Sequence, residues 1–243
     1  MPLKLTPAGP ADAARIAEIH MAAFGSNAML LAQFPTPEVR KGLQESIRLK
    51  ALADIEDPKI SVLVVRDLPS NPAATARVEN GSSNRSGVKE ITSEAETEED
   101  RGGKVVAFAK WSHPTARDDG YEETPWIWPP GTDLEILDGW ARVAEEAQEQ
   151  AVGDKPCYRL TFMGTDPAYE RRGAASMMVR WGLDQCRKKG VLAYIESTLD
   201  AAAFYEKLGF TAFSNLSLEY KIAGQYQAKV YREISFIHRP SSV

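Results

Sequence analysis

The sequence predicts an α/β fold that contains both antiparallel and parallel strand pairs. Two observations carry this prediction. From residue 157 onward, strand-like and helix-like segments alternate in close succession, which favours parallel strands joined by right-handed crossovers. Earlier in the chain, segments 59–66 and 104–112 are both β-like and the stretch between them is too polar to form a core, so we expect these strands to pair antiparallel.

The first half of the chain is predicted to hold two helices and three strands. Residues 10–24 carry apolar side chains on one helical face and begin with a proline, which suits the first turn of a helix. In the last of the three strands we expect Val106 and Phe108 on one face and Val105 and Ala107 on the other. The predicted order is strand 3–6, helix 10–24, helix 35–53, strand 59–66 and strand 104–112.

The second half is predicted to hold three helices and five strands. A capping Asp or Thr precedes the first helix, and small residues open the second. The predicted order is helix 133–150, strand 157–164, helix 173–189, strand 191–196, helix 200–208, and strands 210–213, 216–222 and 229–237.

We predict a single domain over residues 1–243 that carries two insertions. Residues 67–103 contain no aromatic residue and hold six acids and no base between Glu90 and Asp100, so they cannot bury enough apolar area to offset chain entropy. We expect a flexible acidic insertion there. Residues 113–155 form a second insertion, in which aromatic residues lie among prolines ahead of a helix.

Composition excludes several classes of protein. The 243 residues include 29 bases and 34 acids, a net charge of −5, so no basic excess favours a nucleic-acid partner. Neither a signal-like apolar core nor a membrane-spanning run is apparent, and we expect a soluble cytoplasmic protein. The two cysteines, Cys157 and Cys186, have no CxxC spacing, so we expect buried reduced thiols and no metal site.

The most informative segment is the turn between predicted strand 157–164 and predicted helix 173–189. Gly173, Ala174 and Ala175 are small, so a ligand can approach main-chain N–H groups that have no partner at a helix start and that favour anions. Arg171 and Arg172 add positive charge there, although exposed arginines are also common at a plain capped helix. The segment contains neither GxxxxGK[ST] nor GxGxxG, which argues against a P-loop NTPase and a dinucleotide-binding dehydrogenase.

Two segments in this order and spacing resemble the GNAT superfamily of acyl-CoA-dependent N-acetyltransferases. The first is Glu170-Arg-Arg-Gly-Ala-Ala175, close to the family motif [Gln/Arg]-x-x-Gly-x-[Gly/Ala] except that Glu170 replaces Gln or Arg. The second is Ala203-Phe-Tyr-Glu-Lys-Leu-Gly-Phe210, close to the family's closing signature. The resemblance covers about residues 159–213. It implies a central mixed, mostly antiparallel twisted sheet flanked by helices, with a V-shaped splay between the two central parallel strands.

The resemblance also implies where acetyl-CoA, the acyl donor, would bind. In the family the pantetheine arm inserts between the splayed strands and pairs with free backbone groups, and the diphosphate meets the helix start. Mapped onto this sequence, the pantetheine residues are Phe162, Met163, Gly164 and Thr165, and the pyrophosphate residues are Arg171, Arg172, Gly173, Ala174, Ala175 and Ser176.

The reaction that the resemblance implies is direct attack of an amine on the acetyl thioester. Tyr205 matches the family tyrosine that protonates the departing thiolate, the alternative being a packing role on its helix. Glu196, at a strand end, is our leading base, directly or through water. His113, which leaves a strand in Trp111-Ser-His-Pro, is the rival.

The sequence therefore predicts an N-acetyltransferase whose acceptor is a small-molecule amine. We expect Trp126, Trp128 and Trp140 either to wall the acceptor pocket or to pack the insertion onto the core. The alternatives are an acetyltransferase of protein amines and a non-catalytic acyl-CoA-binding or protein-interaction module on the same fold. We expect no nucleic-acid or membrane partner, and a monomer or homodimer.

Overall fold

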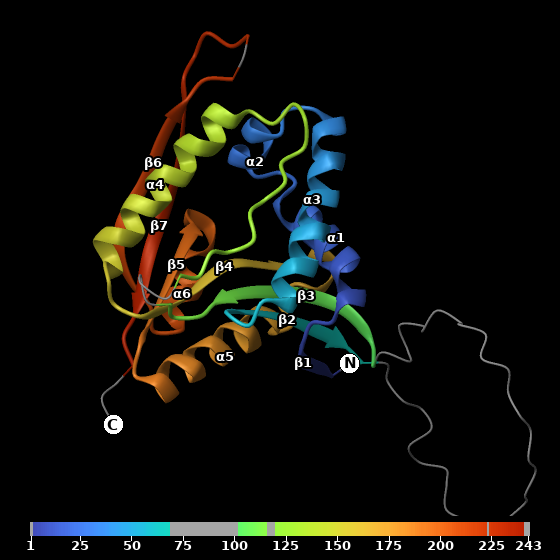
Figure 1. Ribbon diagram of the computed structural model, residues 1–243, viewed down its shortest axis with the longest axis vertical. Coiled ribbons are helices and arrows are strands. Elements are labelled where there is room, and N and C mark those ends of the chain that lie inside the picture. Colours follow the sequence, from blue (N-terminus) through green and yellow to red (C-terminus); the bar gives the residue numbers. More distant parts are fainter. Residues whose placement is uncertain (1, 69–101, 116–119, 223, 241–243) are drawn as a thin grey trace, which may run out of the picture.

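The computed structural model describes residues 2–68, 102–115, 120–222 and 224–240, and within these ranges seven strands form one sheet (Figure 1). The strands are β1 (Leu3–Pro7), β2 (Ile60–Asp67), β3 (Lys104–Ser112), β4 (Cys157–Thr165), β5 (Leu192–Thr198), β6 (Thr211–Tyr220) and β7 (Lys229–His238). The α-helices are α1 (Ala13–Phe24), α2 (Ala28–Gln33), α3 (Pro37–Glu56), α4 (Leu134–Val152), α5 (Ala174–Lys189) and α6 (Ala202–Lys207). Three short 3₁₀ helices are η1 (Pro10–Asp12), η2 (Pro167–Tyr169) and η3 (Leu199–Ala201).

The sheet is mixed and mostly antiparallel, as predicted. Its spatial order is β1-β2-β3-β4-β5-β7-β6, and β4 with β5 is its parallel pair while the other neighbours run antiparallel. Helix α5 connects β4 to β5, because two adjacent parallel strands need a crossover between them.

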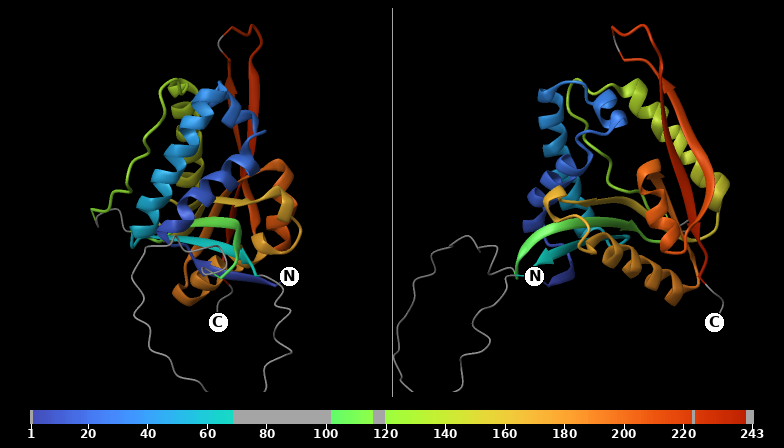
Figure 2. Two further views of the ribbon diagram at one scale, coloured as in Figure 1. Left: turned by 90° about the vertical axis from the view of Figure 1, so that its right-hand side faces the viewer. Right: turned by 180° about the vertical axis from the view of Figure 1, so that it is seen from behind.

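Helices cover both faces of the sheet (Figure 2). On one face, α5 packs Met178 and Val179 against Val106, Ala109 and Trp111 of β3. On the other face, α1 and α3 bury a second core, whose members are Ala13, Ile16, Ile19, Ala51, Val62, Val64, Val105 and Phe108. The sheet is therefore buried on both sides through β2 and β3, which explains why these strands are almost continuously apolar.

The two central parallel strands separate partway along their length, which confirms the predicted splay. β4 pairs with β5 from Cys157↔Leu192 to Leu160↔Ile195. Beyond that point β4 continues to Thr165 beside β3, and β5 continues to Thr198 beside β7. The register between β4 and β5 thus ends while both strands run on.

Several predicted elements differ from the structure. Helix α2 was not predicted because it has only six residues, and the third helix runs to Glu56 rather than to residue 53. The predicted strands 210–213 and 216–222 form one strand, β6, with an irregularity between Ala212 and Ser214. The predicted insertion 67–103 lies mostly outside the described residues, although Asp67 belongs to β2.

The face prediction for β3 is wrong at its start. The register between β2 and β3 shifts after Val65, so that Arg66 pairs with Val105 and Val106 is left as the extra residue of a bulge. Val105 consequently packs with Phe108 beside α1, and Val106 packs on the α5 side with Ala107. A bulge of one residue shifts the alternation of faces, and the sequence alone does not reveal it.

The second predicted insertion consists of an extended segment and a helix. Residues 120–133 run from the α3 side of the molecule to α4, which packs against β6 and β5 (Figure 1). Cys186 is buried, whereas Cys157 is only partly buried. Among the helices of the described ranges, none is both long enough and apolar enough to cross a bilayer. Within the same ranges no group of three or more His, Cys, Asp or Glu residues is placed to hold a metal ion.

Candidate active site

A large cavity of about 860 Å³ begins where β4 and β5 separate. Its floor is formed by the separated ends of both strands, through Thr161, Phe162 and Met163 of β4 and Ser197 and Thr198 of β5. Residues of α1, α2, α3, α4, α6, β7 and the 120–133 segment complete the wall. Five of the predicted site residues line this one cavity, namely Phe162, Met163, Ala175, Glu196 and Tyr205.

Tyr205 reaches the cavity from α6 and is itself almost fully buried, at 7% exposure. Its ring packs edge-on against Phe204 and Phe210 and lies near Phe236. Burial, together with the charge of Glu233, raises the pKa of the phenol well above its usual value. The hydroxyl therefore stays protonated at neutral pH and is available as a proton donor.

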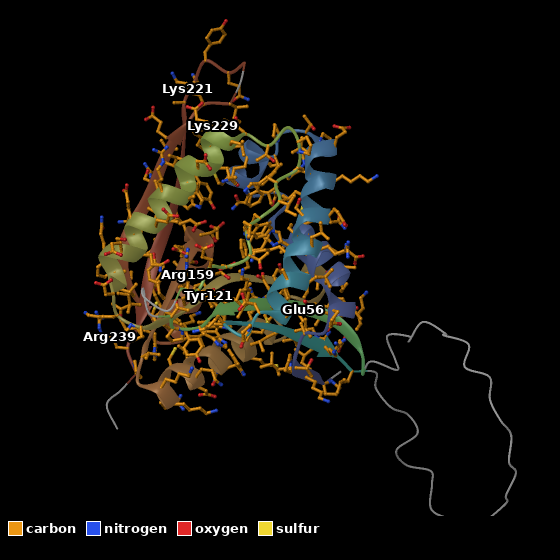
Figure 3. The ribbon with its side chains drawn as sticks, viewed as in Figure 1. Glu56, Tyr121, Arg159, Lys221, Lys229 and Arg239 are labelled. Atoms are coloured by element: carbon orange, nitrogen blue, oxygen red, sulfur yellow. The ribbon has the colours of Figure 1, made fainter. Side chains whose placement is uncertain are left out.

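Glu196 lies on β5, two residues before the strand ends at Thr198, and forms an ion pair with Arg159 of β4. One guanidinium nitrogen, Nη2, lies 3.1 Å from Oε1 and 3.3 Å from Oε2 of the carboxylate. The pair joins the two strands where their register ends, and the side chain of Arg159, which is labelled in Figure 3, is 30% exposed. Although burial opposes its charge, the carboxylate of Glu196 raises the pKa of Arg159.

Glu233 is a further carboxyl group in the cavity that was not among the predicted site residues. It lies on β7 opposite Thr198 of β5, and Tyr231 donates a hydrogen bond of 2.7 Å to its Oε1. Burial raises the pKa of Glu233 to about 7, and the nearby charge of Glu196 acts in the same direction. The only available signal was a carboxylate inside a strand pattern, and the sequence does not reveal that β7 lies next to β5.

His113 is not part of the lining of this cavity. Its Nε2 lies 2.8 Å from Ser61 Oγ, and its ring packs edge-on against Tyr158. Burial and the neighbouring Lys189 lower the pKa of this imidazole. The rival base thus lies just beyond the C-terminal end of β3, against Tyr158, and does not share the cavity with Tyr205 and Glu196.

The turn before α5 contains two residues in left-handed backbone conformations. Arg171 adopts a left-handed conformation with φ of 59°, which is uncommon for a residue with a side chain, and Gly173 caps the helix with φ of 95°. The first bond that closes the helix runs from Met177 N to Gly173 O, so the amides of 174–176 precede the regular pattern. A Cβ added at Gly173 would meet no atom within 4 Å, so the turn is open to solvent.

The remaining predicted cofactor residues lie near the cavity without lining it. Arg172 is held by Asp67 of β2 through hydrogen bonds of 2.9 and 2.7 Å, which lower the pKa of that carboxyl. Gly164 faces the ring of Phe108, which a Cβ would approach to 2.9 Å, so packing against β3 accounts for this glycine. Thr165 pairs with Ala107 of β3.

The tryptophans of the second insertion both line the cavity and pack on the core. Trp126 and Trp128 stack in parallel with ring centroids 4.8 Å apart, and Trp126 also meets Phe162 edge-on. Trp140 of α4 lines another part of the wall and packs edge-on against Tyr231. The two alternatives for these residues are therefore combined in one arrangement.

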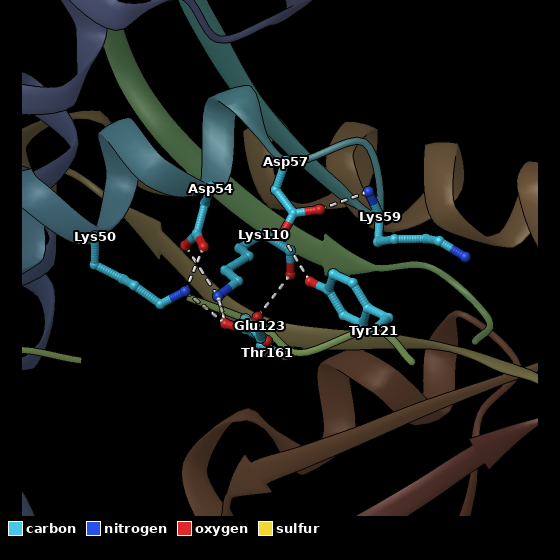
Figure 4. Close-up of polar contacts among 8 residues, drawn as sticks. All are labelled: Lys50, Asp54, Asp57, Lys59, Lys110, Tyr121, Glu123 and Thr161. Carbon is cyan, nitrogen blue, oxygen red and sulfur yellow. Dashed lines mark hydrogen bonds and ion pairs between the residues drawn. The ribbon is translucent and has the colours of Figure 1, made fainter. Parts of the chain in front are cut away.

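A buried ion network anchors the extended segment to the wall of the cavity (Figure 4). Asp54 of α3 binds Lys50 at 2.5 Å and Lys110 of β3 at 2.9 Å, and Glu123 of the segment binds the same two lysines. Although burial opposes it, the two carboxylates raise the pKa of Lys50. Nearby, the hydroxyl of Tyr121 donates to Asp57 at 2.7 Å. These contacts hold the segment beside the stacked tryptophans.

The site places a protonated phenol and two carboxyl groups beside the turn before α5, where the amides of 174–176 precede the regular helical bonding pattern. The protonated phenol of Tyr205 and the carboxyl groups of Glu196 and Glu233 face one space. Ala175, next to the turn, lines the same space, so a molecule with an anionic group at the turn can extend into the cavity between β4 and β5.

Comparison with known proteins agrees with this geometry. A model of the acetyltransferase (GNAT) family matches residues 88–210. The "Probable acyltransferase SID5" of Ajellomyces capsulatus is 34% identical over 99 residues, which are 40% of this chain and 65% of that relative. The chain therefore aligns with somewhat less than two thirds of its curated relative.

Two solved structures illustrate the shared fold. A putative arylalkylamine N-acetyltransferase 7 from the yellow fever mosquito superposes with a TM-score of 0.57 at 13% identity, over 98% of this chain and 87% of that one. Arabidopsis thaliana NAA60 in complex with acetyl-CoA superposes with a TM-score of 0.51 at 13% identity, over 99% of this chain and 100% of that one. At such identities the likeness concerns the fold.

Proposed function

The chain belongs to the acetyltransferase (GNAT) family, and from this premise we propose that it is an acetyl-CoA-dependent N-acetyltransferase that acts on a small-molecule amine by direct attack. One observation carries the proposal. The cavity that opens where β4 and β5 separate connects the turn before α5 with Tyr205 and with an aromatic chamber. An acyl donor and an amine can therefore meet in one cavity.

The residues at the splay fit acetyl-CoA. The register between β4 and β5 ends at Leu160 and Ile195, and the freed edges line the cavity, which suits an extended pantetheine arm that pairs with backbone groups. The left-handed turn at Arg171 and Gly173 and the amides of 174–176 suit a diphosphate. When bound, acetyl-CoA supplies an acetyl thioester whose C–S bond breaks as the amine nitrogen bonds to the carbonyl carbon.

We assign the predicted donor-binding residues to two parts of this site. Phe162, Met163, Gly164 and Thr165 would form the pantetheine edge, and Arg171, Arg172, Gly173, Ala174, Ala175 and Ser176 the diphosphate turn. Arg172 differs from the others because Asp67 already holds it, so its contribution is to fix the turn against β2. Tyr205 would give its hydroxyl proton to the sulfur that leaves.

The lining of the acceptor chamber supports a small amine. Trp126, Trp128 and Phe162 offer an apolar wall, which suits an acceptor with an aromatic or aliphatic body. The lining bases Lys110 and Arg159 are each held in an ion pair, whereas three further carboxylates line the cavity, those of Asp138, Glu145 and Glu233. A net negative lining attracts the ammonium form of an amine. The mosquito arylalkylamine enzyme, which shares the fold, supports the same acceptor class.

The experiment is a turnover assay of the full chain with acetyl-CoA across a panel of amines. The panel contains arylalkylamines, aliphatic diamines, amino acids and short peptides with free N-termini, and release of free CoA is measured. We expect release with at least one small amine and little with the peptides. Release with peptides alone would move the acceptor to protein amines. Binding of CoA without release in the presence of any amine would identify a non-catalytic module instead.

A further inference from the structure

We propose that Glu233, and not Glu196, is the catalytic residue that takes the proton from the acceptor amine, and that Tyr231 and Asn27 position its carboxylate. This assignment rests on the proposed function and adds a residue to it. It also gives the two carboxylates different roles. Glu233 accepts a proton from the acceptor, whereas Glu196 fixes the point at which β4 and β5 separate.

The two carboxylates lie on the same face of neighbouring strands but at different depths. Glu196 pairs in register with Ser235, and Thr198 pairs with Glu233, so the two acids sit diagonally across β5 and β7. Glu196 lies one position past the last register pair between β4 and β5. Glu233 lies further along the direction in which β4 has already moved away, and residues of α2 and α4 line the same cavity.

Glu196 is already engaged by a cation. The guanidinium of Arg159 contacts both of its oxygens, at 3.1 and 3.3 Å, and the carboxylate side chain is only 12% exposed. Because both of its oxygens already contact a cation on β4, this carboxylate serves to join the two strands rather than to meet the acceptor nitrogen. The pair spans β4 and β5 and thereby fixes the point at which the two strands separate.

Glu233 is held by a chain of neutral donors. Asn27 Nδ2 donates to the Tyr231 hydroxyl oxygen at 2.8 Å, and that hydroxyl donates to Glu233 Oε1 at 2.7 Å. The chain links the N-cap of α2 to β7, so it fixes the carboxylate across the width of the cavity. One oxygen is thus used for positioning, and Oε2 is the oxygen that the acceptor nitrogen would meet.

The charged and titratable neighbours of Glu233 make it a base suited to neutral pH. Glu196 faces it from β5, Tyr205 from α6 and Tyr231 from its own strand, and Asp138 and Glu145 of α4 line the same cavity. Burial raises the pKa of Glu233 to about 7. Its charge in turn contributes to the raised pKa of Tyr205. The carboxyl group thus titrates near neutral pH while the phenol stays protonated, which suits a base role for Glu233 and an acid role for Tyr205.

The proton balance assigns one transfer to each group. The acceptor enters as an ammonium ion, and Glu233 Oε2 takes one proton from it, which leaves a neutral amine with a lone pair for attack. Tyr205 gives its hydroxyl proton to the sulfur that leaves. The second proton lost by the acceptor nitrogen returns to the Tyr205 oxygen, and Glu233 releases its own to solvent. The sum is one amide, one thiol and one proton.

The test compares Glu233→Gln with the matched variant Glu196→Gln. The pH profile of kcat/KM for the best amine of the panel is measured for both variants and for the unmodified protein. We expect the unmodified protein to lose activity below a midpoint near pH 7, and Glu233→Gln to lose that midpoint together with about 10²-fold in kcat. Glu196→Gln should keep the midpoint. Loss of the midpoint in Glu196→Gln and its retention in Glu233→Gln would overturn the assignment.

A readout without turnover tests the same claim in the unliganded protein. With ¹³C-labelled glutamate side chains, one carboxyl resonance should titrate near pH 7 and be absent from the Glu233→Gln spectrum. If that resonance instead belongs to Glu196, or if Glu233 titrates near pH 4.5, the assignment is wrong. Glu233→Asp keeps a carboxylate and should retain the kinetic midpoint at reduced kcat. It serves as a control for the possibility that Glu233→Gln loses activity because it fails to fold.

The same measurements distinguish a failure of the proposed function from a failure of the Glu233 assignment. An unmodified protein that turns over no amine would contradict the proposed function and this assignment together. An active unmodified protein whose pH profile is unchanged in Glu233→Gln would contradict the assignment alone. For Tyr231→Phe, as a positioning residue, we expect a lower kcat and a displaced midpoint rather than a lost one.

Discussion

The two sides of the cavity are built by different means. On the donor side, β4, β5 and the turn before α5 present main-chain groups, and the important side chains there are small, such as Gly173 and Ala175. On the acceptor side, α1 to α4, β7 and residues 120–133 present large aromatic and charged side chains. A backbone site depends on conformation and tolerates many side chains, whereas a side-chain site depends on contacts between residues that are far apart in the sequence.

This difference determines how far the effect of a substitution spreads on each side of the cavity. The acceptor wall is held by buried ion pairs that join α3, β3 and the 120–133 segment, so removing one charge affects several elements together. The donor side is held by the sheet and by the cap of α5, so local changes there stay local. Three substitutions test the contrast, beginning with the largest expected effect.

The first substitution is Lys110→Met, on the acceptor side. It removes a cation that binds both Asp54 and Glu123, and it leaves two carboxylates that share Lys50 alone. Breaking a buried pair costs roughly 3–5 kcal/mol, and because Lys50 remains we expect a loss of about 3 kcal/mol in the free energy of unfolding. Urea denaturation measures it. The KM for the acceptor should rise while the affinity for acetyl-CoA stays unchanged.

The control for this substitution lies on helix α3 itself. Arg48 pairs with Glu45 at 2.7 Å on the exposed face, and Arg48→Met should leave both stability and KM unchanged, since exposed pairs contribute little. Equal losses in the two variants would show that the network adds nothing beyond an ordinary surface pair.

The second substitution is Tyr205→Phe, at the boundary between the two sides. It keeps the aromatic packing with Phe210 and Phe236 and removes only the hydroxyl. We expect kcat to fall about 10²-fold with little change in the dissociation constant of acetyl-CoA. Steady-state kinetics and calorimetric binding measure the two quantities. Parallel losses of affinity and stability, with kcat preserved, would assign Tyr205 to packing.

The third substitution is Gly173→Ala, on the donor side. The added methyl group forces a residue with a side chain into φ of 95° and stands where the diphosphate would approach. A left-handed conformation costs roughly 1–2 kcal/mol, so we expect a small fall in stability and about a tenfold loss of affinity for acetyl-CoA. The acceptor KM should not change.

Gly190 supplies the matched control at the other end of α5. Its φ is 66° and it too has open space around its Cβ position, so Gly190→Ala carries a similar backbone penalty far from the turn. Stability should fall by a similar amount in both variants, and affinity for acetyl-CoA should fall only in Gly173→Ala. A loss of affinity in both would mean that helix stability, rather than the turn, controls binding.

The contrast between the two sides also explains how far the sequence can be interpreted. The donor side is local, because a strand, a turn and a helix follow one another. Gly173 and Ala175 were predicted as small residues at a helix start, and Tyr205 was predicted from the resemblance to the family's closing signature. The position of β4 beside β5, and their separation after Leu160, agree with what the resemblance implied.

Most residues of the acceptor side could not be predicted from the sequence, because they are far apart in the chain and come together only in the folded structure. Glu233 reaches the cavity because β7 inserts between β5 and β6, and no pattern in the sequence fixes that order. Lys110 looks like an isolated charge within an apolar strand until Asp54 and Glu123 are placed beside it. The shift of face at Val106 depends on a bulge that has no sequence signature.

The central claim is that the separated ends of β4 and β5 receive the arm of the acyl donor. A crystal structure of the full chain grown with CoA tests it most directly. The account predicts the diphosphate on the amides of 171–176, the pantetheine arm between β4 and β5 beyond Leu160 and Ile195, and the thiol directed toward Tyr205. CoA bound elsewhere, or β4 and β5 hydrogen-bonded to each other along their whole length, would contradict it.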